Sequence, residues 1–215
     1  SYLQLARHQY YLTKSEQNSL EHIPVFADRG VIYDKNQKEL AWNTLSQDGT
    51  LKVRSYTSTA GFASLLGYVS YPAKDAKGRF WQTRTIGRDG IEKEFDEALA
   101  GTNGTKLIET DVNGDVLSES TIEQPAQGQI MTLAIDANVQ EVLAKGIIDL
   151  SAQSGYIGGT GVIMDIYTGE ILAMTSVPEY DSSSLSLGKD KTLIASYMQD
   201  DSRPFLNRAL EGLYT

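Results

Sequence analysis

The segment that comes nearest to a catalytic motif is Ser-Leu-Gly-Lys at residues 186–189, which fits the Ser-x-x-Lys pattern of serine acyl-transfer enzymes. In such enzymes one helical turn brings the lysine amine to the serine hydroxyl, so that the amine takes the hydroxyl proton. Here Gly188 lies inside that turn, and the chain has no Ser-x-Asn or Lys-Thr-Gly segment to complete the site. The sequence therefore predicts that Ser186 is a loop serine.

A second candidate, the segment Asp111–Asp115, begins like a calcium-binding loop. Its pattern is incomplete, because the sixth position is Val116 instead of glycine and the twelfth is Ile122 instead of a bidentate glutamate. The Asn113-Gly114 pair instead predicts a type I′ hairpin turn, since both residues tolerate positive φ. A hairpin turn explains the segment better than a calcium site.

Residues for zinc, thiol and phosphate-loop chemistry are missing as well. The chain has no cysteine, and its two histidines, His8 and His22, are fourteen positions apart, which nearly excludes a zinc or Ser-His-Asp site. The glycine-containing segments at residues 101–106 and 158–161 do not match a phosphate loop, and we expect turns there. No cofactor is therefore predicted.

The composition is that of a folded, soluble chain of one large domain or two small ones. Of the 215 residues, 40% are hydrophobic and 22% are charged. The net charge of -9 would repel a phosphate backbone, so nucleic acid is a poor partner. Apolar runs are far shorter than the ~20 residues that cross a bilayer, and the amino end lacks the layout of a signal peptide. We expect that any membrane anchor has been removed.

Strands are predicted where short β-branched runs flank an aspartate and turn-forming residues. Three segments show this pattern and predict β-hairpins: residues 31–42, 107–117 and 161–174. Helical spacing appears in residues 1–19, which lack glycine and proline and precede Pro24. It also appears in residues 91–101, where the apolar side chains of positions 91, 95 and 99 fall on one face.

A longer helix is predicted to begin after the N-cap residue Asp136 and to end before Gly155. Its apolar positions recur at helical spacing: Val139, Val142, Leu143, Ile147 and Leu150. A boundary between two parts of the chain is expected near residues 124–128, where the hairpin-rich region gives way to a strand, helix and hairpin. The sequence therefore predicts an α+β fold in two pieces.

Six segments, in order along the chain, resemble motifs of the class B penicillin-binding proteins, the monofunctional D,D-transpeptidases that crosslink peptidoglycan. Three resemble the Arg-Gly-x-Ile-x-Asp-Arg-Asn-Gly-x-x-Leu-Ala, Arg-x-Tyr-Pro…Ala-x-x-x-Gly-Tyr-Val and Gly-x-x-Gly-Ile-Glu…Leu-x-Gly-x-x-Gly motifs: Arg29–Asn43, Arg54–Val69 and Gly87–Gly104. Three resemble the Leu-Thr-Ile-Asp-x-x-x-Gln motif, the opening hairpin of the transpeptidase fold and the stretch before the nucleophile: Leu133–Gln140, Gly161–Asp181 and Phe205–Tyr214.

The chain also departs from the family pattern. Lys35 replaces the arginine and Gln37 the glycine of the first motif, Thr57 replaces the motif proline, and Ala134 replaces a threonine. In the family, the last of these segments runs within a few residues into Pro-Gly-Ser-x-x-Lys, which these 215 residues do not contain. We therefore expect that this chain alone lacks the nucleophile and is not acylated by penicillin.

The resemblance implies an elongated, hairpin-rich pedestal at residues 1–125, of the non-catalytic dimerisation type, and the first helix and β-hairpin of a penicillin-binding transpeptidase domain at residues 126–215. It marks a set of structural motif residues: Arg29, Gly30, Asp34, Arg54, Gly67, Gly90, Glu92, Asp136, Gln140, Asp165, Gly169, Asn207 and Arg208. The first and third motifs pack together in this family, so Arg29 is expected to pair with Glu92. The family turn also implies a positive φ at Gln37.

The function that the resemblance implies is that of the parent protein, a bacterial, membrane-anchored transpeptidase of cell-wall synthesis and cell shape. The expected location is extracytoplasmic, in the periplasm or at the cell surface, with an anchoring helix in the inner or plasma membrane. One expected partner is the remainder of the transpeptidase domain, in the same or a second chain. The others are a glycosyltransferase of the SEDS class (shape, elongation, division and sporulation), other wall-synthesis membrane proteins and peptidoglycan precursor. The alternative is a free-standing extracytoplasmic protein-interaction module without catalysis.

Overall fold

The computed structural model of the chain describes residues 19–46, 52–111 and 115–213. The chain forms two compact units: unit 1, with residues 1–27 and 102–126, and unit 2, with residues 28–101 and 127–215. The helix expected before residue 19 and the turn expected at Asn113-Gly114 lie outside the described residues. Among the described helices, none combines the length and the apolar character needed to cross a membrane.

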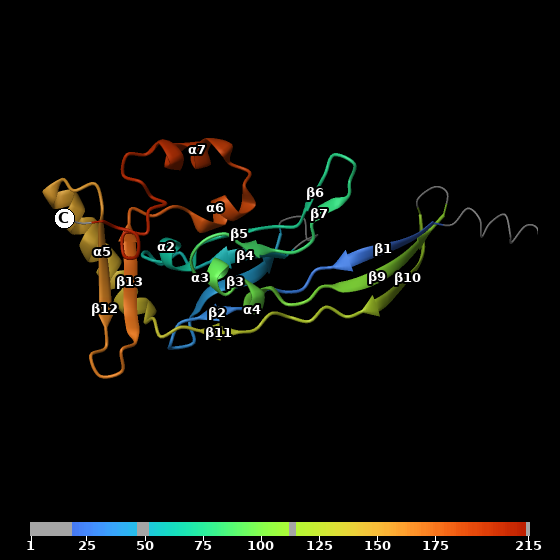
Figure 1. Cartoon of the computed structure of the whole chain (residues 1–215), viewed down its shortest axis with the longest axis horizontal. Helices are drawn as coiled ribbons and strands as arrows, with labels where there is room; N and C mark the ends of the chain where they lie inside the picture. The colour runs from blue at the N-terminus through green and yellow to red at the C-terminus, as the bar shows by residue number, and fades with distance from the viewer. Residues whose placement is uncertain (1–18, 47–51, 112–114, 214–215) are drawn as a thin grey trace, which may run out of the picture. The chain divides into compact units, whose positions relative to one another are not determined.

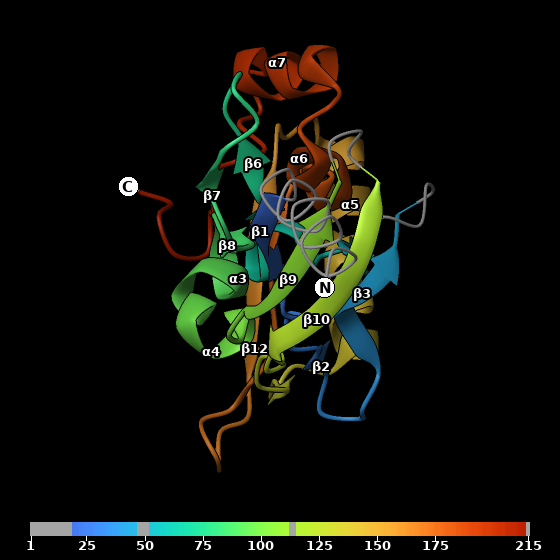
Figure 2. The same cartoon turned by 90° about the vertical axis from the view of Figure 1, so that its right-hand side faces the viewer.

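Unit 1 contains an antiparallel three-stranded sheet. Across the sheet the strands are β1 (Ser19–Val25), β9 (Gly104–Thr110) and β10 (Val116–Glu123), which lie side by side in Figures 1 and 2. The pairing of β9 with β10 confirms the hairpin predicted at residues 107–117. Every residue of β10 is exposed, so this sheet buries little apolar surface.

Unit 2 contains a four-stranded sheet. Across it the strands are β11 (Met131–Thr132), β2 (Ile32–Tyr33), β3 (Glu39–Leu45) and β4 (Lys52–Tyr56), with β11 parallel to β2 and the other pairs antiparallel. The β2–β3 pair confirms the hairpin predicted at residues 31–42. In its turn Gln37 has φ +65°, the positive value that the family turn implies.

The core of unit 2 gathers side chains from the four-stranded sheet, from helix α2 (Ala63–Leu66) and from the segment before helix α5 (Ala137–Ser154). Its buried members are Ile32, Leu40, Ala41, Phe62, Leu65, Leu66, Leu99, Ile135 and Ala137. Two short ladders accompany this core: β5 (Val69–Ser70) with β8 (Ile86–Gly87), and β6 (Ala73–Lys74) with β7 (Phe80–Gln82).

The prediction of a single helix at residues 91–101 is wrong. The structure has two short helices, α3 (Gly90–Glu94) and α4 (Asp96–Ala100), separated at Phe95, whose φ of -108° and ψ of 27° leave the helical region. The break follows from tertiary contacts, because the carbonyl of Glu92 accepts a hydrogen bond from Arg29 Nη2 at 2.7 Å. Phe95 is consequently 45% exposed, whereas Leu99 is buried.

The long predicted helix is confirmed as α5, which Asp136 caps by accepting hydrogen bonds from the second and third residues of the helix. It packs along the hairpin of β12 (Gly159–Met164) and β13 (Ile171–Val177), seen beside it in Figure 1, which confirms the third predicted hairpin. The predicted apolar face is only partly right, because Val142 is 72% and Leu150 57% exposed. The buried side chains of α5 are Ala137, Gln140 and Ala144.

The prediction of a turn at residues 158–161 is also wrong, because Gly159 and Gly161 lie within strand β12. A Cβ atom at Gly161 would lie 2.8 Å from Leu143 Cδ1, and one at Gly159 would lie 2.8 Å from Ile147 Cγ2. The glycines are therefore places where the helix lies directly on the strand. The segment at residues 101–106 likewise runs into a strand, since β9 begins at Gly104.

Two further helices follow the hairpin in unit 2: α6 (Ser182–Leu187) and α7 (Lys191–Gln199). Taken together, the described residues form the α+β fold that the sequence predicts. The domain boundary expected between residues 125 and 126 stays a prediction. The chain passes from unit 1 to unit 2 beside that point, and unit 2 also includes residues 28–101.

Candidate functional site

A buried glutamate in unit 2 connects two buried arginines. The carboxylate of Glu92, which is 0% exposed, accepts hydrogen bonds from Arg29 Nε at 2.5 Å and from Arg54 Nε at 2.7 Å. Each carboxylate oxygen thus has its own guanidinium partner, which offsets the cost of removing these charges from water. The predicted Arg29–Glu92 pair is confirmed, and Arg54 is an additional partner that the sequence did not reveal.

The same network extends to Asp96. Its carboxylate accepts hydrogen bonds from Arg29 Nη1 at 2.8 Å and from the backbone N–H of Gly87 at 2.7 Å, and it forms an ion pair with Arg84 at 2.9 Å. Three arginines and two carboxylates therefore meet between β4, α3, α4 and the residues before β2. We refer to Arg29, Arg54, Arg84, Glu92 and Asp96 as the charged joint.

Three motif glycines lie where backbone segments of unit 2 approach each other closely. A Cβ atom at Gly30 would lie 1.8 Å from the carbonyl oxygen of Gln129, and one at Gly67 would lie 1.9 Å from that of Asp89. At Gly90, where φ is +55°, a Cβ atom would lie 2.6 Å from the carbonyl oxygen of Leu65. Any larger residue at these positions would push the segments around the charged joint apart.

Two motif aspartates connect the β2–β3 turn to the start of α5. Asp34, which is buried, accepts hydrogen bonds from two backbone N–H groups of its own turn and from the N–H of Ala137 at 3.1 Å. Asp136 accepts a hydrogen bond from Asn36 Nδ2 at 3.0 Å. This bond, followed by the backbone bond from Val139, lowers the pKa of Asp136 below 3.8.

Gln140 is the buried polar side chain of α5, and it holds two other segments. Its amide nitrogen donates to the carbonyl oxygens of Gly61 at 2.5 Å and Met174 at 2.7 Å, and its oxygen accepts from the N–H of Met174 at 2.7 Å. Gly61 has φ +96°, and a Cβ atom there would lie 2.8 Å from the Ala144 side chain. Gln140 therefore fixes the residues that precede α2 against α5 and β13.

The remaining motif residues lie in the C-terminal part of unit 2. Asp165 and Gly169 form the β12–β13 turn, where backbone hydrogen bonds from residues 168 and 167 lower the pKa of Asp165. Asn207 donates to the carbonyl of Ser64 in α2 at 3.4 Å. Arg208 is buried and donates to carbonyl oxygens at residues 202 and 203. These residues form turns or hydrogen-bond to backbone groups, and none of them belongs to the charged joint.

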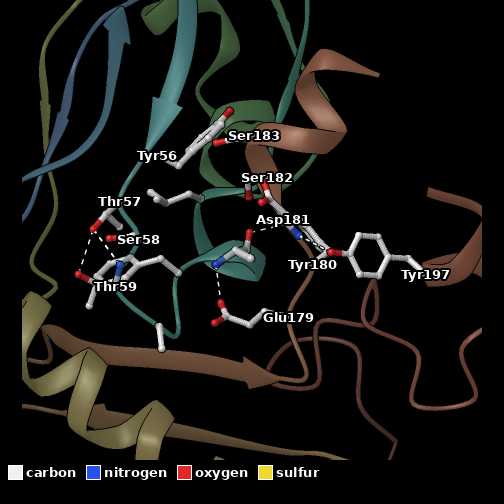
Figure 3. A pocket seen from close by; sticks show the side chains of 14 residues that line it. Tyr56, Thr57, Ser58, Thr59, Glu179, Tyr180, Asp181, Ser182, Ser183 and Tyr197 are labelled. Atoms are coloured by element: carbon white, nitrogen blue, oxygen red, sulfur yellow. Dashed lines mark hydrogen bonds between the residues drawn. The ribbon is translucent and has the colours of Figure 1, made fainter. Parts of the chain in front are cut away.

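A pocket of about 500 Å³ opens between the segment after β4 and the segment that leads into α6 (Figure 3). On its floor both carboxylate oxygens of Glu179 accept backbone hydrogen bonds, from Gly61 and Ala63, each at 2.7 Å. Burial raises the pKa of Glu179, and these two bonds partly offset the shift. Tyr180 bonds through its hydroxyl to Asp89 at 2.9 Å and to the carbonyl of Ala63 at 3.1 Å.

The sequence analysis did not predict this pocket. The conformation of the nearby Ser186 also differs from the predicted loop. Ser186 lies in helix α6 instead of a loop, and its hydroxyl donates to the carbonyl of Ser182 at 2.7 Å and accepts from the N–H of Val69 at 3.1 Å. Gly188 ends the helix at φ +61°, so Lys189 is not on the same helical turn. The missed signal was Asp181, an N-cap residue directly before the serine run.

Metal binding finds no support in the described parts of the chain. Within them, no three aspartate, glutamate or histidine side chains gather into a group that could hold a metal ion. The site is therefore built from ion pairs, backbone contacts and hydroxyl groups. Such an arrangement can hold segments in register and can offer hydrogen bonds to a ligand in the pocket.

Several known proteins that are similar to this chain are peptidoglycan D,D-transpeptidases. Residues 49–133 match the family described as the Penicillin-binding Protein dimerisation domain. The chain is 24% identical to the peptidoglycan D,D-transpeptidase MrdA of Salmonella typhimurium strain LT2, over 99% of this chain and 46% of that protein. It is 29% identical to MrdA of Acinetobacter baumannii, over 77% of this chain and 24% of that protein. The chain thus spans about half or less of the length of these curated relatives.

Two further similarities extend this result. The peptidoglycan D,D-transpeptidase FtsI of Escherichia coli strain K12 is 27% identical, over 62% of this chain and 21% of that protein. A solved structure described as "Structural coordination of polymerization and crosslinking by a peptidoglycan synthase complex" matches with a TM-score of 0.69 and 21% identity. The match covers 96% of this chain and 48% of that chain, and it shows the fold.

Proposed function

Because the chain is a homologue of the class B penicillin-binding proteins, we propose that it is the scaffold of a protein that crosslinks peptidoglycan stem peptides. In this proposal residues 1–125 are the non-catalytic pedestal and residues 126–215 begin the transpeptidase domain. The reaction belongs to the whole protein. A serine hydroxyl attacks the D-Ala-D-Ala bond of a stem peptide, D-alanine leaves, and a neighbouring amine then takes the acyl group from the serine.

The observation that carries the proposal is the way unit 2 joins the two proposed regions. Residues of the dimerisation-domain match and residues after 127 belong to one compact unit. Gln140 holds the carbonyl of Gly61, and Glu179 holds the N–H groups of Gly61 and Ala63. A pedestal tied in this way to the first helix and hairpin of a catalytic domain would hold that domain in a fixed position.

The hairpin and α5 also present a surface that suits the remainder of a transpeptidase domain. Among the described strands, β12 pairs only with β13, so its outer edge is open. Apolar side chains on and beside this hairpin are exposed, including Val162, Met164, Ile166 and Tyr167. Burial of such surface is favourable by ~25 cal/mol per Å². We assign it to the segment that completes the sheet, in the same or a second chain.

The proposed surroundings follow from the relatives. The structural neighbour is part of a peptidoglycan synthase complex. We assign to this chain, by analogy, a SEDS-class glycosyltransferase and other wall-synthesis membrane proteins as partners. By the same analogy we propose that the protein lies outside the cytoplasm, in the periplasm or at the cell surface, attached to the inner or plasma membrane by an N-terminal helix.

The test is labelling of the complete gene product with a fluorescent penicillin. The proposal expects covalent labelling, and it expects Gln140→Ala to reduce the labelling rate because the scaffold no longer fixes the segment before α2. Glu141→Ala is the matched control, since Glu141 is its neighbour in α5 and forms an ion pair with Lys145 at the surface. A complete gene product that folds but is never labelled would favour the alternative, a free-standing interaction module.

A further inference from the structure

The hairpin of β6 and β7 in unit 2 presents an exposed indole ring. Trp81 of β7 is 67% exposed, and the turn of the hairpin projects past the β5–β8 ladder in Figure 1. The preceding residue, Phe80, is half-buried, and Lys74 Nζ lies 4.6 Å from the centroid of its ring. Two adjacent aromatic residues and a cation therefore occupy one small surface.

A buried glutamine fixes the direction in which Trp81 points. Gln82 is 5% exposed, and its amide nitrogen donates to the carbonyl oxygens of Tyr71 at 2.8 Å and Arg84 at 3.0 Å. Its oxygen accepts a hydrogen bond from Arg88 Nη2 at 3.2 Å. Because side chains alternate along a strand, the inward position of Gln82 turns Trp81 outward. The exposed indole is thus held in place before any partner binds, so binding would cost little conformational entropy.

The turn of the hairpin is also well ordered by hydrogen bonds, and it carries cations. Asp75 Oδ1 accepts hydrogen bonds from the N–H groups of Lys77 and Arg79, each at 2.9 Å. Gly78 supplies the positive φ of +79° that the turn requires. Lys77 is exposed, and Arg79, which pairs with Asp75 at 3.1 Å, is 74% exposed. The turn therefore holds two solvent-facing cations close to Trp81.

The hairpin is cationic, whereas the chain as a whole is acidic. Residues 71–82 contain one acid, Asp75, and three cations, so their net charge is +2 in a chain of net charge -9. The three cations are Lys74, Lys77 and Arg79. Exposed charges interact over ~10 Å at 0.1 M salt, so the local charge decides what this hairpin attracts. Its partner should be anionic and should also accommodate an indole ring.

We propose that the β6–β7 hairpin docks on the headgroup region of an anionic phospholipid bilayer. Tryptophan favours the membrane–water interface, because its ring is apolar while its N–H can still find a hydrogen-bond partner there. Lysine and arginine near an anionic bilayer are attracted to its headgroups. An acidic protein would also match the cations, but a hairpin this short offers less surface than the ~800 Å² per partner of a stable protein interface. A bilayer surface has no such requirement.

This docking surface goes beyond the scaffold function and does not depend on it. The scaffold function rests on contacts within unit 2, such as those of Gln140 and Glu179, whereas the hairpin faces solvent. The two proposals can also fail separately. Penicillin labelling of the complete gene product tests catalysis, and vesicle binding tests the hairpin.

The experiment measures co-sedimentation of the purified 215-residue chain with phosphatidylglycerol vesicles and, for comparison, with phosphatidylcholine vesicles. Binding to the anionic vesicles is expected, and it should weaken as salt is added. Tryptophan fluorescence should shift to shorter wavelength on binding. The shift should be lost in Trp81→Phe, in which Trp42 is the remaining tryptophan. Trp81→Ala and Lys77→Glu should each weaken binding by about fivefold or more, with little change in the melting temperature.

Two control variants separate the hairpin from general surface effects. Tyr167→Ala removes an aromatic side chain that is 92% exposed in the β12–β13 turn, and Lys189→Glu reverses an exposed charge outside the hairpin. Both should bind like the wild type. The proposal is overturned if the wild type does not bind the anionic vesicles, if it binds both kinds of vesicle equally, or if the controls lose as much affinity as the hairpin variants. Displacement from the vesicles by poly-L-glutamate at an equal concentration of charge would also overturn it, and would indicate an acidic protein partner.

Discussion

An exposed ion pair in unit 1 contrasts with a buried network of ion pairs in unit 2. In unit 1, Lys106 of β9 and Glu119 of β10 form a cross-strand pair whose side chains are 31% and 46% exposed. In unit 2, Glu92 is 0% exposed and is shared by Arg29 and Arg54, whose side chains are 3% and 1% exposed. Water screens the first pair and is excluded from the second.

The difference shows where the fold is vulnerable. Removing one member of an exposed pair leaves the other charge in water, at a cost of ~1 kcal/mol or less. Removing Glu92 leaves Arg54 buried without its carboxylate and leaves Arg29 with Asp96 as its carboxylate partner. The charged joint is therefore a place where a single substitution affects the packing of β4, α3 and the residues before β2 together.

The largest predicted effect is in the charged joint. Arg29→Ala or Glu92→Ala should each lower the free energy of unfolding by about 3–5 kcal/mol, because the partner charge remains buried. A double-mutant cycle in urea should give a coupling energy of about 2 kcal/mol or more. The same cycle on Lys106 and Glu119 is the control and should give less than ~1 kcal/mol. Equal coupling in the two units would contradict the comparison.

Gln140→Ala should have the next largest effect. It removes three hydrogen bonds and leaves backbone groups of Gly61 and Met174 unpaired, at a cost of about 2–4 kcal/mol. Chemical denaturation of the Gln140→Ala and Glu141→Ala chains measures the difference. If both substitutions cost the same, Gln140 does not fix the segment before α2.

A substitution in the β2–β3 turn is expected to raise the free energy of unfolding, by less than the losses predicted above. Gln37 has φ +65°, where a residue with a Cβ atom is strained by ~1 kcal/mol relative to glycine. Gln37→Gly should therefore raise the melting temperature slightly, which calorimetry can measure. A fall would mean that the Gln37 side chain stabilises the turn through contacts that outweigh the strain.

The smallest predicted effect concerns pH. Burial raises the pKa of Glu179 above 4.5, so its contribution to stability is fully present below pH 4.5 and declines as the pH rises through the folded pKa. The stability advantage of the wild type over Glu179→Gln should therefore shrink from about pH 4 to pH 7. Asp136 is the control, because its contribution to stability should depend on pH in the opposite direction. Its lowered pKa adds stability that is present above 3.8 and is lost as the pH falls.

Features that depend on neighbouring residues could be predicted from the sequence. The three hairpins follow from alternating strands and turn residues, and α5 follows from Asp136 and Gly155 at its ends. The break at Phe95 could not be foreseen, because it depends on Arg29 donating to the Glu92 carbonyl across a separation of 63 residues. The glycines of β12 looked like turn residues because the packing of α5 on them is also non-local.

In the candidate site, too, the contacts between residues distant in sequence could not be predicted from local sequence. The Arg29–Glu92 pair was predictable only from the resemblance, since nothing in the local sequence links the two residues. Arg54 joins the same carboxylate through the pairing of β3 with β4, and its role became visible only in the structure. Glu179 was missed because a lone acid before an N-cap aspartate has no pattern of its own, and its partners lie 116 and 118 residues away.

Because Gln140 and Glu179 tie them together, the segment before α2 and the α5–β13 region should open as one unit, whereas the sheet of unit 1 should open separately. Native-state hydrogen exchange on the 215-residue chain tests it most directly. We expect the amides of Gly61, Ala63 and Met174, which Glu179 and Gln140 hold, to exchange with one common opening free energy, higher than that of the β10 amides. Early exchange of Gly61 and Ala63 while Met174 and α5 stay protected would contradict it.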